Sequence, residues 1–261
     1  MPRRWTPAEE RSKSLELKRL YVRENKTIGE IGKLLGIAEQ TVFQRLERLG
    51  IPTAPERKAT YAARRRQDVV VPKCYTAKLA EFFGIMLGDG RLAPYQVVVT
   101  LGTKEYGYAR HVCWLMEELF GVLARVAVRG SGYRDVYLGS LDLVEWFKRE
   151  GLVHNKVRFQ VDIPAWIFSR REFLNAFVRG FFDTDGSVYA LRFGTQLSFT
   201  NRSAPLLRSL RRALLLLGYH PSMVSSYCIY LTRRDEIVRF FREVRPANIK
   251  HRQRFAAILG R

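Results

Sequence analysis

Cysteine is scarce in this chain: its 261 residues include three, Cys74, Cys113 and Cys228. They are odd in number and far apart, which excludes a disulfide-built scaffold and a zinc site of the paired C-x-x-C type. Acidic residues are also few, 25 against 45 Lys and Arg, so the formal net charge is +20. This excess predicts a polyanionic partner, because basic side chains that neutralise phosphates release condensed counterions. A merely soluble or ribosome-associated basic protein is the alternative.

Long apolar runs are missing as well. No stretch of about 18 apolar residues occurs, and the N-terminal MPRRW lacks the apolar core of a signal peptide. We therefore expect no membrane insertion, and a cytoplasmic or nucleoid-associated location. The 47% hydrophobic content is nevertheless enough to bury a core, which excludes wholesale disorder.

Residues 1–53 predict a small all-α helix-turn-helix domain. Apolar residues recur at helical spacing through 8–24, including Leu15, Leu17, Leu20 and Tyr21. Thr27 followed by Glu30 is the capping-box pattern that opens a helix, in which Ile28, Ile31, Leu34 and Leu35 share a face. Gly36 ends this helix.

A second helix is expected from about Ala38, with Gly50 and Pro52 stopping it. Gln40, Gln44 and Arg45 lie off its apolar face, where the second helix of a helix-turn-helix reads DNA. The alternative is a helical hairpin that contacts protein.

Residues 54–75 read as a basic linker with prolines at its ends and an arginine run inside. Arg64 and Arg65 are predicted to contact DNA from this linker. A solvated tether is the competing interpretation.

The rest of the chain contains one unit written twice. LAEFFGIMLGDG at 79–90 returns as NAFVRGFFDTDG at 175–186, and each copy is followed by an alternating strand, a helix, two more strand-like runs and a helix. This predicts two αββαββα repeats, 76–165 and 166–261, of α+β class and related by an approximate two-fold axis.

Small residues form a stripe on the first helix of each repeat. Gly84 and Gly88 stand at i and i+4, and so do Gly180 and Thr184. Without bulky side chains there, the two helices can pack backbone against backbone.

The stripe leads to an acid in each copy. Gly90 and Gly186 are predicted C′ residues, so Asp89 and Asp185 stand at helix C-termini, where the helix dipole disfavours an anion. If the helices pack side by side, the two carboxylates meet among free carbonyl oxygens. Such an all-oxygen site suits Mg²⁺. A simple turn is the alternative for a single Asp-Gly pair, and the repetition argues against it.

FFGIMLGDG (82–90) and VRGFFDTDG (178–186) resemble the motif of the LAGLIDADG homing endonucleases in their single-chain, two-motif form, and the pattern extends over about residues 76–255. The resemblance implies saddle-shaped antiparallel sheets. It also implies that Asp89 and Asp185 bind the metal, Mg²⁺ or Mn²⁺ as a substitute, with the carbonyls of Gly88 and Thr184 assisting. Asp183, at the sixth motif position, is expected to be a capping or rim residue.

The resemblance further implies basic and amide groups near the scissile phosphates. Lys104, Arg202 and Asn201 occupy those positions, although Arg202 stands where the family has Lys and Thr103 where it has an amide. Ordinary surface charge is the alternative.

The alternation of residues along each strand then predicts which side chains face the core and which face the opposite side of the sheet. Val99, Leu101, Leu197 and Phe199 are predicted to face the core. Candidates for groove contact are Gln96, Val98, Thr100, Arg125, Arg129, Arg192, Gln196 and Ser198.

Taken together, the resemblance implies a metal-dependent endonuclease that cuts double-stranded DNA at a long, asymmetric site, as a monomer acting as a pseudo-dimer. Two alternatives remain open. A transcription regulator of the same superfamily would keep the saddle and lose the acids, both of which are present here. An RNA-splicing maturase would share the saddle.

Overall fold

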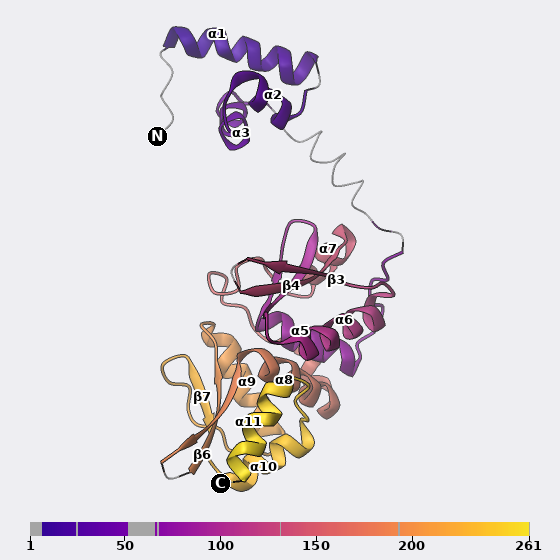
Figure 1. The fold of residues 1–261 in the computed structure, drawn as a ribbon, viewed down its shortest axis with the longest axis vertical. Coiled ribbons are helices and arrows are strands. Elements are labelled where there is room, and N and C mark those ends of the chain that lie inside the picture. Colours follow the sequence, from indigo (N-terminus) through magenta and orange to yellow (C-terminus); the bar gives the residue numbers. More distant parts are fainter. Residues whose placement is uncertain are drawn as a thin grey trace. The chain divides into compact units, whose positions relative to one another are not determined.

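The computed structural model describes residues 7–24, 26–51, 66, 68–130, 132–192 and 194–260 (Figure 1). The chain divides into two compact units, 1–63 and 64–261. The boundaries expected at residues 53, 75 and 165 stay predictions. Within the described parts of the chain, no helix combines the length and the apolar composition needed to cross a bilayer.

The described residues of the first unit form helices and the turns between them. Helix α1 (Pro7–Lys18) continues into a π-helical turn, η1 (Arg19–Arg23), followed by α2 (Ile28–Leu35) and α3 (Glu39–Arg48). The predicted capping box is confirmed: the Thr27 amide donates to Glu30 Oε2 at 2.8 Å, and the Glu30 amide donates to Thr27 Oγ1 at 3.2 Å. Gly36 ends α2 with a left-handed φ of 62°.

A small core holds this unit together. It contains Leu17, Leu20, Tyr21, Ile31, Val42, Leu46 and Ile51. Leu15 and Leu34, which we expected on buried faces, are 71% and 60% exposed. The short helices described in this unit enclose only a narrow core, and these two side chains fall outside it.

The second unit opens with a complete αββαββα repeat. Its elements are α5 (Ala77–Leu87), β1 (Gly90–Leu92), β2 (Gln96–Gly102), α6 (Tyr106–Phe120), β3 (Arg125–Arg129), β4 (Tyr133–Gly139) and α7 (Leu141–Arg149). The strands form an antiparallel sheet in the order β1-β2-β4-β3.

The second copy follows the same plan, with a smaller sheet and with one more helix at its C-terminal end. Its elements are the 3₁₀ turn η2 (Ala165–Ser169), α8 (Arg171–Asp185), β5 (Gly186–Leu191), β6 (Gly194–Thr200), α9 (Ala204–Leu216), β7 (Cys228–Leu231), α10 (Arg234–Glu243) and α11 (Ile249–Leu259). The sheet order is β5-β6-β7, so β7 takes the place of β4. Among the described residues, a single bridge between Ser225 and Cys228 stands where the first copy has β3. The tandem α+β plan is confirmed, and the predicted second pair of strands in this copy is wrong.

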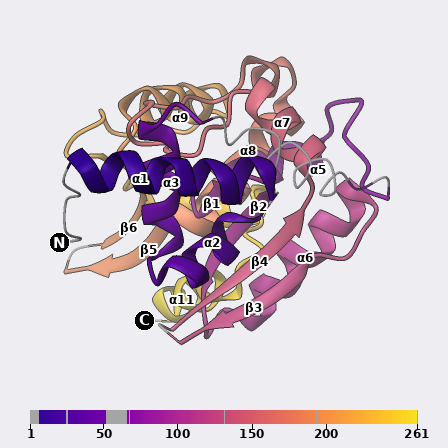
Figure 2. The same ribbon diagram turned by 90° about the horizontal axis from the view of Figure 1, so that it is seen from above.

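Helices α5 and α8 lie side by side between the two sheets (Figures 1 and 2). A Cβ atom added to Gly84 would lie 2.3 Å from the carbonyl oxygen of Phe177, and one added to Gly180 would lie 2.0 Å from that of Glu81. Real Cβ atoms essentially never approach so closely. The predicted backbone-to-backbone packing through the glycine stripe is therefore confirmed.

Gly90 and Gly186 are not the left-handed C′ residues that we predicted. Helix α5 is capped by Gly88 with a φ of −82°, and Gly186 caps α8 with a φ of −91°. A Cβ on Gly90 would lie 2.4 Å from Met86 Cα, and one on Gly186 would lie 2.3 Å from the Phe182 carbonyl oxygen. Glycine is needed here because the chain turns back closely over its own helix.

Candidate active site

The ends of α5 and α8 bring two acids together. Asp185 is the last residue of α8, and Asp89 follows the residue that caps α5. A Cβ on Gly88 would lie 2.0 Å from Thr184 Oγ1 and 3.5 Å from Asp185 Cγ. The two motifs therefore meet at their acidic ends.

Both acids are in an environment that disfavours their ionised forms. Burial raises the pKa of Asp185 to about 6; the hydrogen bond from Asn201 lowers it, and the nearby Asp89 charge raises it. Burial also raises the pKa of Asp89, and the positive charge of Lys156 opposes this rise. Buried carboxylates whose ionised forms are disfavoured in this way are stabilised by a cation.

Asn201 holds the second acid in place. Its Nδ2 donates to Asp185 Oδ2 at 2.7 Å, while its Oδ1 accepts from the Ser203 amide at 2.9 Å. In the first repeat the aligned residue, Thr103, offers no amide. The two half-sites therefore differ in how their aspartates are supported.

The other two predicted residues stand further out. Lys104 and Arg202 are exposed in the turns after β2 and β6. Among the ion pairs of the described residues, neither reaches Asp89 or Asp185. Their predicted contact with phosphate stays a prediction.

Lys156 was not predicted and lies at the centre of the site. Its Nζ donates to the carbonyl oxygens of Met86 at 3.0 Å and Leu87 at 3.1 Å, and also to that of Gly88. Burial lowers the pKa of Lys156 to about 8, against the negative charges of Asp185 and Asp89. This ammonium group therefore neutralises the C-terminal end of α5. In the sequence it is a single lysine after Asn155, near the end of the first repeat, with no motif around it.

The donors at this site fit a hard cation. Asp89 and Asp185 supply carboxylate oxygens, and Gly88 and Thr184 have backbone carbonyls at the same helix ends. The described residues contain no group of three or more His, Cys, Asp or Glu side chains that could hold a metal. An oxygen set of this kind suits Mg²⁺, which keeps several waters and shares substrate phosphates. The Lys156 ammonium on the Gly88 carbonyl competes for the same oxygen.

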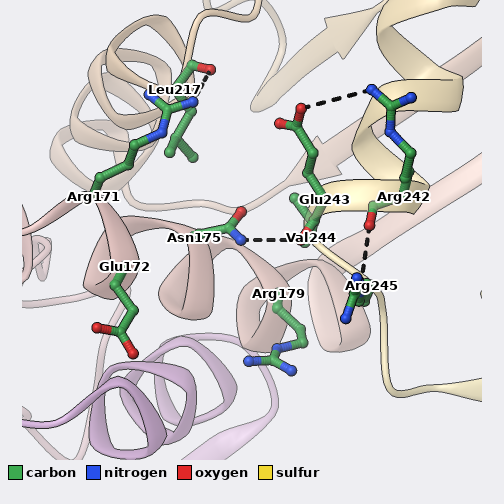
Figure 3. Close-up of a pocket in the computed structure, with 9 residues that line it drawn as sticks. All are labelled: Arg171, Glu172, Asn175, Arg179, Leu217, Arg242, Glu243, Val244 and Arg245. Carbon is green, nitrogen blue, oxygen red and sulfur yellow. Dashed lines mark hydrogen bonds and ion pairs between the residues drawn. The ribbon is translucent and has the colours of Figure 1, made fainter.

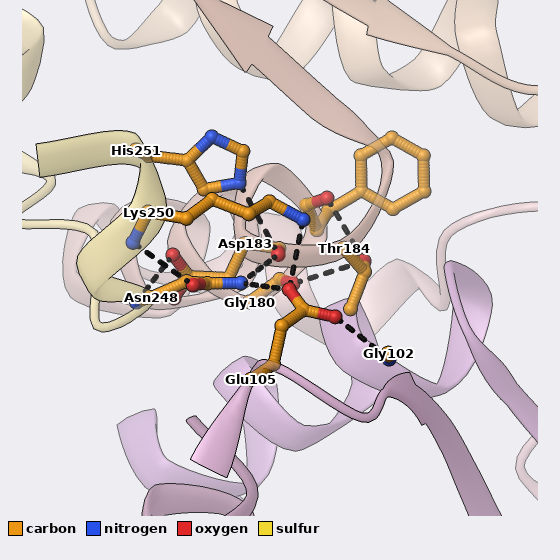
Figure 4. Close-up of polar contacts among 9 residues, drawn as sticks. Gly102, Glu105, Gly180, Asp183, Thr184, Asn248, Lys250 and His251 are labelled. Carbon is orange, nitrogen blue, oxygen red and sulfur yellow. Dashed lines mark hydrogen bonds and ion pairs between the residues drawn. The ribbon is translucent and has the colours of Figure 1, made fainter. Parts of the chain in front are cut away.

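Asp183 is buried rather than at the rim (Figure 4). Its Oδ2 accepts from the Ala247 amide and its Oδ1 from the Asn248 amide, both at 2.9 Å. Both amides precede α11, whose first turn is capped by the side chain of Asn248, so Asp183 holds the approach to that helix and is neither the expected helix cap nor a rim residue. Burial raises the pKa of Asp183 to about 7.

Asn248 then joins the two repeats (Figure 4). Its Nδ2 donates to Glu105 Oε1 of the first repeat at 2.8 Å and to the Asp183 carbonyl of the second at 3.1 Å. Lys250 Nζ meets the same Glu105 oxygen at 2.8 Å, and Glu105 Oε2 accepts from the Gly102 amide at 2.8 Å. The start of α11 thus connects both halves, and one of its partners, Asp183, lies two residues before Asp185 in α8.

The sheets sort the predicted groove contacts. Val99, Leu101, Leu197 and Phe199 are buried in the core, as predicted. Gln96, Thr100 and Gln196 are half-buried on the opposite faces, whereas Arg125, Arg129 and Arg192 are exposed.

Two of the predicted contacts need correction. Val98 is 1% exposed and Ser198 is 6% exposed. Each is flanked on its own sheet face by residues of the two neighbouring strands. Val98 lies between Arg91 and Tyr137, and Ser198 lies between Ser187 and Tyr230. Neighbouring side chains cover them, so the predicted groove contact is wrong for both.

In the first unit Gln40 and Gln44 are exposed and Arg45 is half-buried. Arg64 and Arg65 lie outside the described residues.

A hollow of about 800 Å³ lies at the other end of α8 (Figure 3). Four arginines line it: Arg171, Arg179, Arg242 and Arg245. Arg171 donates to the Leu216 and Leu217 carbonyl oxygens at 3.2 and 3.1 Å, which closes the end of α9. Arg179 pairs with the buried Glu81 at 3.2 Å. Two of these arginines thus hold helices together.

Residues 172–245 match the model of the LAGLIDADG-like domain family. This segment runs from the start of α8 to the end of α10 and includes the second motif. The resemblance of the chain to LAGLIDADG proteins is thereby confirmed.

The other comparisons are partial. The chain is 28% identical over 124 residues to an A-type ATP synthase subunit of Pyrococcus abyssi (strain GE5 / Orsay), covering 47% of this chain and 12% of that protein. It is 30% identical over 115 residues to the replication factor C small subunit of Methanocaldococcus jannaschii, covering 44% of this chain and 6% of that protein. The chain thus spans a small part of each curated relative.

Two solved structures are similar to this chain at low identity. The N-terminal LAGLIDADG domain of DUF199/WhiA has a TM-score of 0.47 and 16% identity, covering 67% of this chain and 86% of that chain. I-DmoI in complex with DNA and Ca has a TM-score of 0.46 and 17% identity, covering 64% of this chain and 88% of that chain.

Proposed function

We propose that this LAGLIDADG protein is a metal-dependent, site-specific endonuclease of homing type that cuts double-stranded DNA at a long asymmetric target. The observation that carries the proposal is the meeting of Asp89 and Asp185 at the ends of two glycine-packed helices. Open sheet faces with exposed arginines flank this pair, in a chain of net charge +20. Because the two repeats differ in sequence, the preferred target differs in its two halves.

Divalent ions bound by the paired acids would polarise the scissile phosphates and activate the attacking water. The chain's own residues supply the rest. Asp89, Asp185 and the adjoining carbonyls offer the ligands, and Asn201 fixes the orientation of the Asp185 carboxylate. Lys104 and Arg202 extend from exposed turns, where they can bind the phosphates on either side.

A second candidate function is DNA binding without cleavage, as in a transcription regulator. Lys156 favours it, because its ammonium group already occupies the Gly88 carbonyl oxygen that a metal would need. The retained acid pair favours the nuclease, because two carboxylates placed together have no evident value in a protein that only binds DNA.

The first unit is proposed to bind DNA beside the cleavage site. Gln40 and Gln44 are exposed on α3, which follows α2 after a short turn, in the arrangement of a recognition helix. The amide groups of these two side chains can read base edges in the major groove, while the basic residues around them contact phosphate.

The acid pair provides the decisive test. A plasmid library with a randomised insert is incubated with the full chain in Mg²⁺, and DNA bound in Ca²⁺ is recovered in parallel. We expect the unmutated chain to linearise a subset of plasmids in Mg²⁺. Asp89→Asn and Asp185→Asn should each abolish cleavage and leave binding nearly intact.

Asp235→Asn is the matched control. It removes one exposed acid at the start of α10 and should cut like the unmutated chain. Full cleavage by the double variant Asp89→Asn/Asp185→Asn would refute the site. A chain that binds selected DNA and cuts none of it in Mg²⁺ or Mn²⁺ would establish the second candidate.

A further inference from the structure

One carboxylate lies apart from the acid pair, on the face of the first sheet that carries Gln96, Thr100 and Arg129, here called the open face. Asp135 lies on β4, directly opposite Thr100 of β2, and its side chain is 6% exposed. Thr100 Oγ1 donates to Asp135 Oδ1 at 2.7 Å. Arg91 of β1 donates to Asp135 Oδ2 through Nη2 at 3.3 Å, and Arg129 of β3 pairs with the same oxygen through its own Nη2. All four strands of the sheet thus contribute to one cluster.

We propose that Asp135 is a positioning residue and that Arg91 and Arg129 are its specificity-determining pair, reading two guanines in the half-site bound by the first repeat. This inference rests on the proposed function because it requires DNA to bind on the open sheet face. It does not require that the DNA is cut.

The burial of Asp135 argues for base reading rather than phosphate binding. A buried carboxylate is costly unless it stays paired, so the two guanidinium groups are held permanently at the middle of the sheet. Phosphate contacts tolerate mobile side chains, whereas a base edge must be met at a fixed position. Holding both arginines in advance also removes much of the rotamer entropy that ordering them on DNA would cost.

The remaining guanidinium edges point to guanine. Asp135 meets each arginine at Nη2, and the arginine side chains are still 42% and 55% exposed. Arginine matches the O6 and N7 acceptors of guanine with two hydrogen bonds, while adenine presents a donor at one of these positions. The cluster keeps one net positive charge for this contact.

The shared oxygen also sets the spacing of the two bases. Arg91 Nη2 lies 3.3 Å from Asp135 Oδ2, and Arg129 Nη2 contacts the same atom. Base pairs stack about 3.4 Å apart. The two guanines therefore lie in adjacent or next-adjacent base pairs.

Binding selections in Ca²⁺ test the inference without cleavage. Randomised duplexes are selected on the full chain, and the affinity for every single-base variant of the selected site is measured. We expect two guanines within one or two base pairs in one half-site. Arg91→Ala and Arg129→Ala should each remove the preference at one of them, by roughly 5- to 150-fold relative to the other bases.

Two further variants separate base reading from general affinity. Arg125→Ala removes an exposed arginine of the same strand and face as Arg129, outside the contacts of Asp135, and should weaken binding to all sequences alike. Asp135→Asn should relax both guanine positions without weakening binding to unrelated DNA, because it removes a negative charge.

Several results would overturn the inference. It fails if the selected site has no guanine pair, if Arg91→Ala and Arg129→Ala lower all affinities evenly as Arg125→Ala does, or if Asp135→Asn keeps full discrimination. Truncation of the two exposed arginines leaves the core intact, so their test stands even where Asp135→Asn unfolds the chain. Selected binding without cuts in Mg²⁺ would defeat the nuclease and leave this inference standing, whereas absence of DNA binding would defeat both.

Discussion

Replacing Gly84 by alanine tests the helix pair on which the active site depends. The added Cβ would lie 2.3 Å from the Phe177 carbonyl oxygen and 2.6 Å from the Phe181 amide nitrogen, whereas ordinary contact begins at 3.4 Å. Both obstacles are backbone atoms, so no side chain can move aside. Helix α5 must shift away from α8 by about 1 Å, which forfeits a quarter to a half of the dispersion energy at the contacts that open.

Overpacking of this kind costs about 1–3 kcal/mol of unfolding free energy. For a unit of this size, each kcal/mol lowers the melting temperature by about 2–4 °C, so we expect a fall of about 2–12 °C. The shift also separates Asp89 from Asp185, so Mg²⁺-dependent cleavage should fall further than DNA binding.

Urea denaturation and thermal melting measure the effect, with Gly107→Ala as the matched control. Gly107 lies in α6, where an added Cβ meets nothing within 4 Å. Alanine favours a helix over glycine by up to about 1 kcal/mol, so this variant should be as stable as the unmutated chain or more so. If Gly84→Ala melted at the unmutated temperature, the two helices would not be packed through this stripe.

Three other perturbations follow from the structure. Burial, assisted by Lys250, lowers the pKa of His251 to about 4 from 6.5, so its neutral form stabilises the fold fully above pH 6.5 and this stability is lost as pH falls toward 4. Between pH 6.5 and 4 the free energy of unfolding of the unmutated chain should fall by on the order of 3 kcal/mol relative to that of His251→Gln. Parallel pH profiles of the two proteins in urea denaturation would show the assignment to be wrong. Asn248→Asp keeps the side-chain oxygen that accepts from the Lys250 amide but loses the amide group that donates to Glu105, so the free energy of unfolding should fall by about 1–3 kcal/mol. Asn248→Ala loses both contacts. Unchanged stability of Asn248→Asp would show that Asn248 does not link the two repeats. Deleting residues 1–66 should leave cleavage and weaken binding, with the slope of log affinity against log salt falling by about 0.9 per lost phosphate contact, and an identical slope and footprint would show that the first unit does not touch this DNA.

Some of the tertiary structure could be predicted because it is local or repeated. The capping box of Thr27 and Glu30 joins residues three apart, so the helix start is readable from spacing alone. The glycine stripe occurs twice, and the repetition predicted the close approach that Gly84 and Gly180 make. Asn201 is expected from the family resemblance, and it does contact Asp185.

Other predictions failed where one copy departs from the other or where neighbours decide burial. The strand after α9 is reduced to a bridge at Ser225, because the residues before it include Pro221 and lack the alternation of Arg125–Arg129 in the first copy. Val98 and Ser198 alternate correctly to the open faces, but residues of adjoining strands cover them. A period of two gives the face of a strand and says nothing of the side chains beside it.

The sequence by itself determined the α+β repeat, the packing stripe and the pair of acids, because each is set by residues within one helix or by repetition of one pattern. Only the tertiary structure decided which distant groups surround those acids. Lys156 reaches the end of α5 from some 70 residues away, Asn248 joins Glu105 to Asp183, and Asp135 gathers arginines from two outer strands. These contacts exist because folding buries charges that must then find partners, and no local spacing records which partner lies nearest.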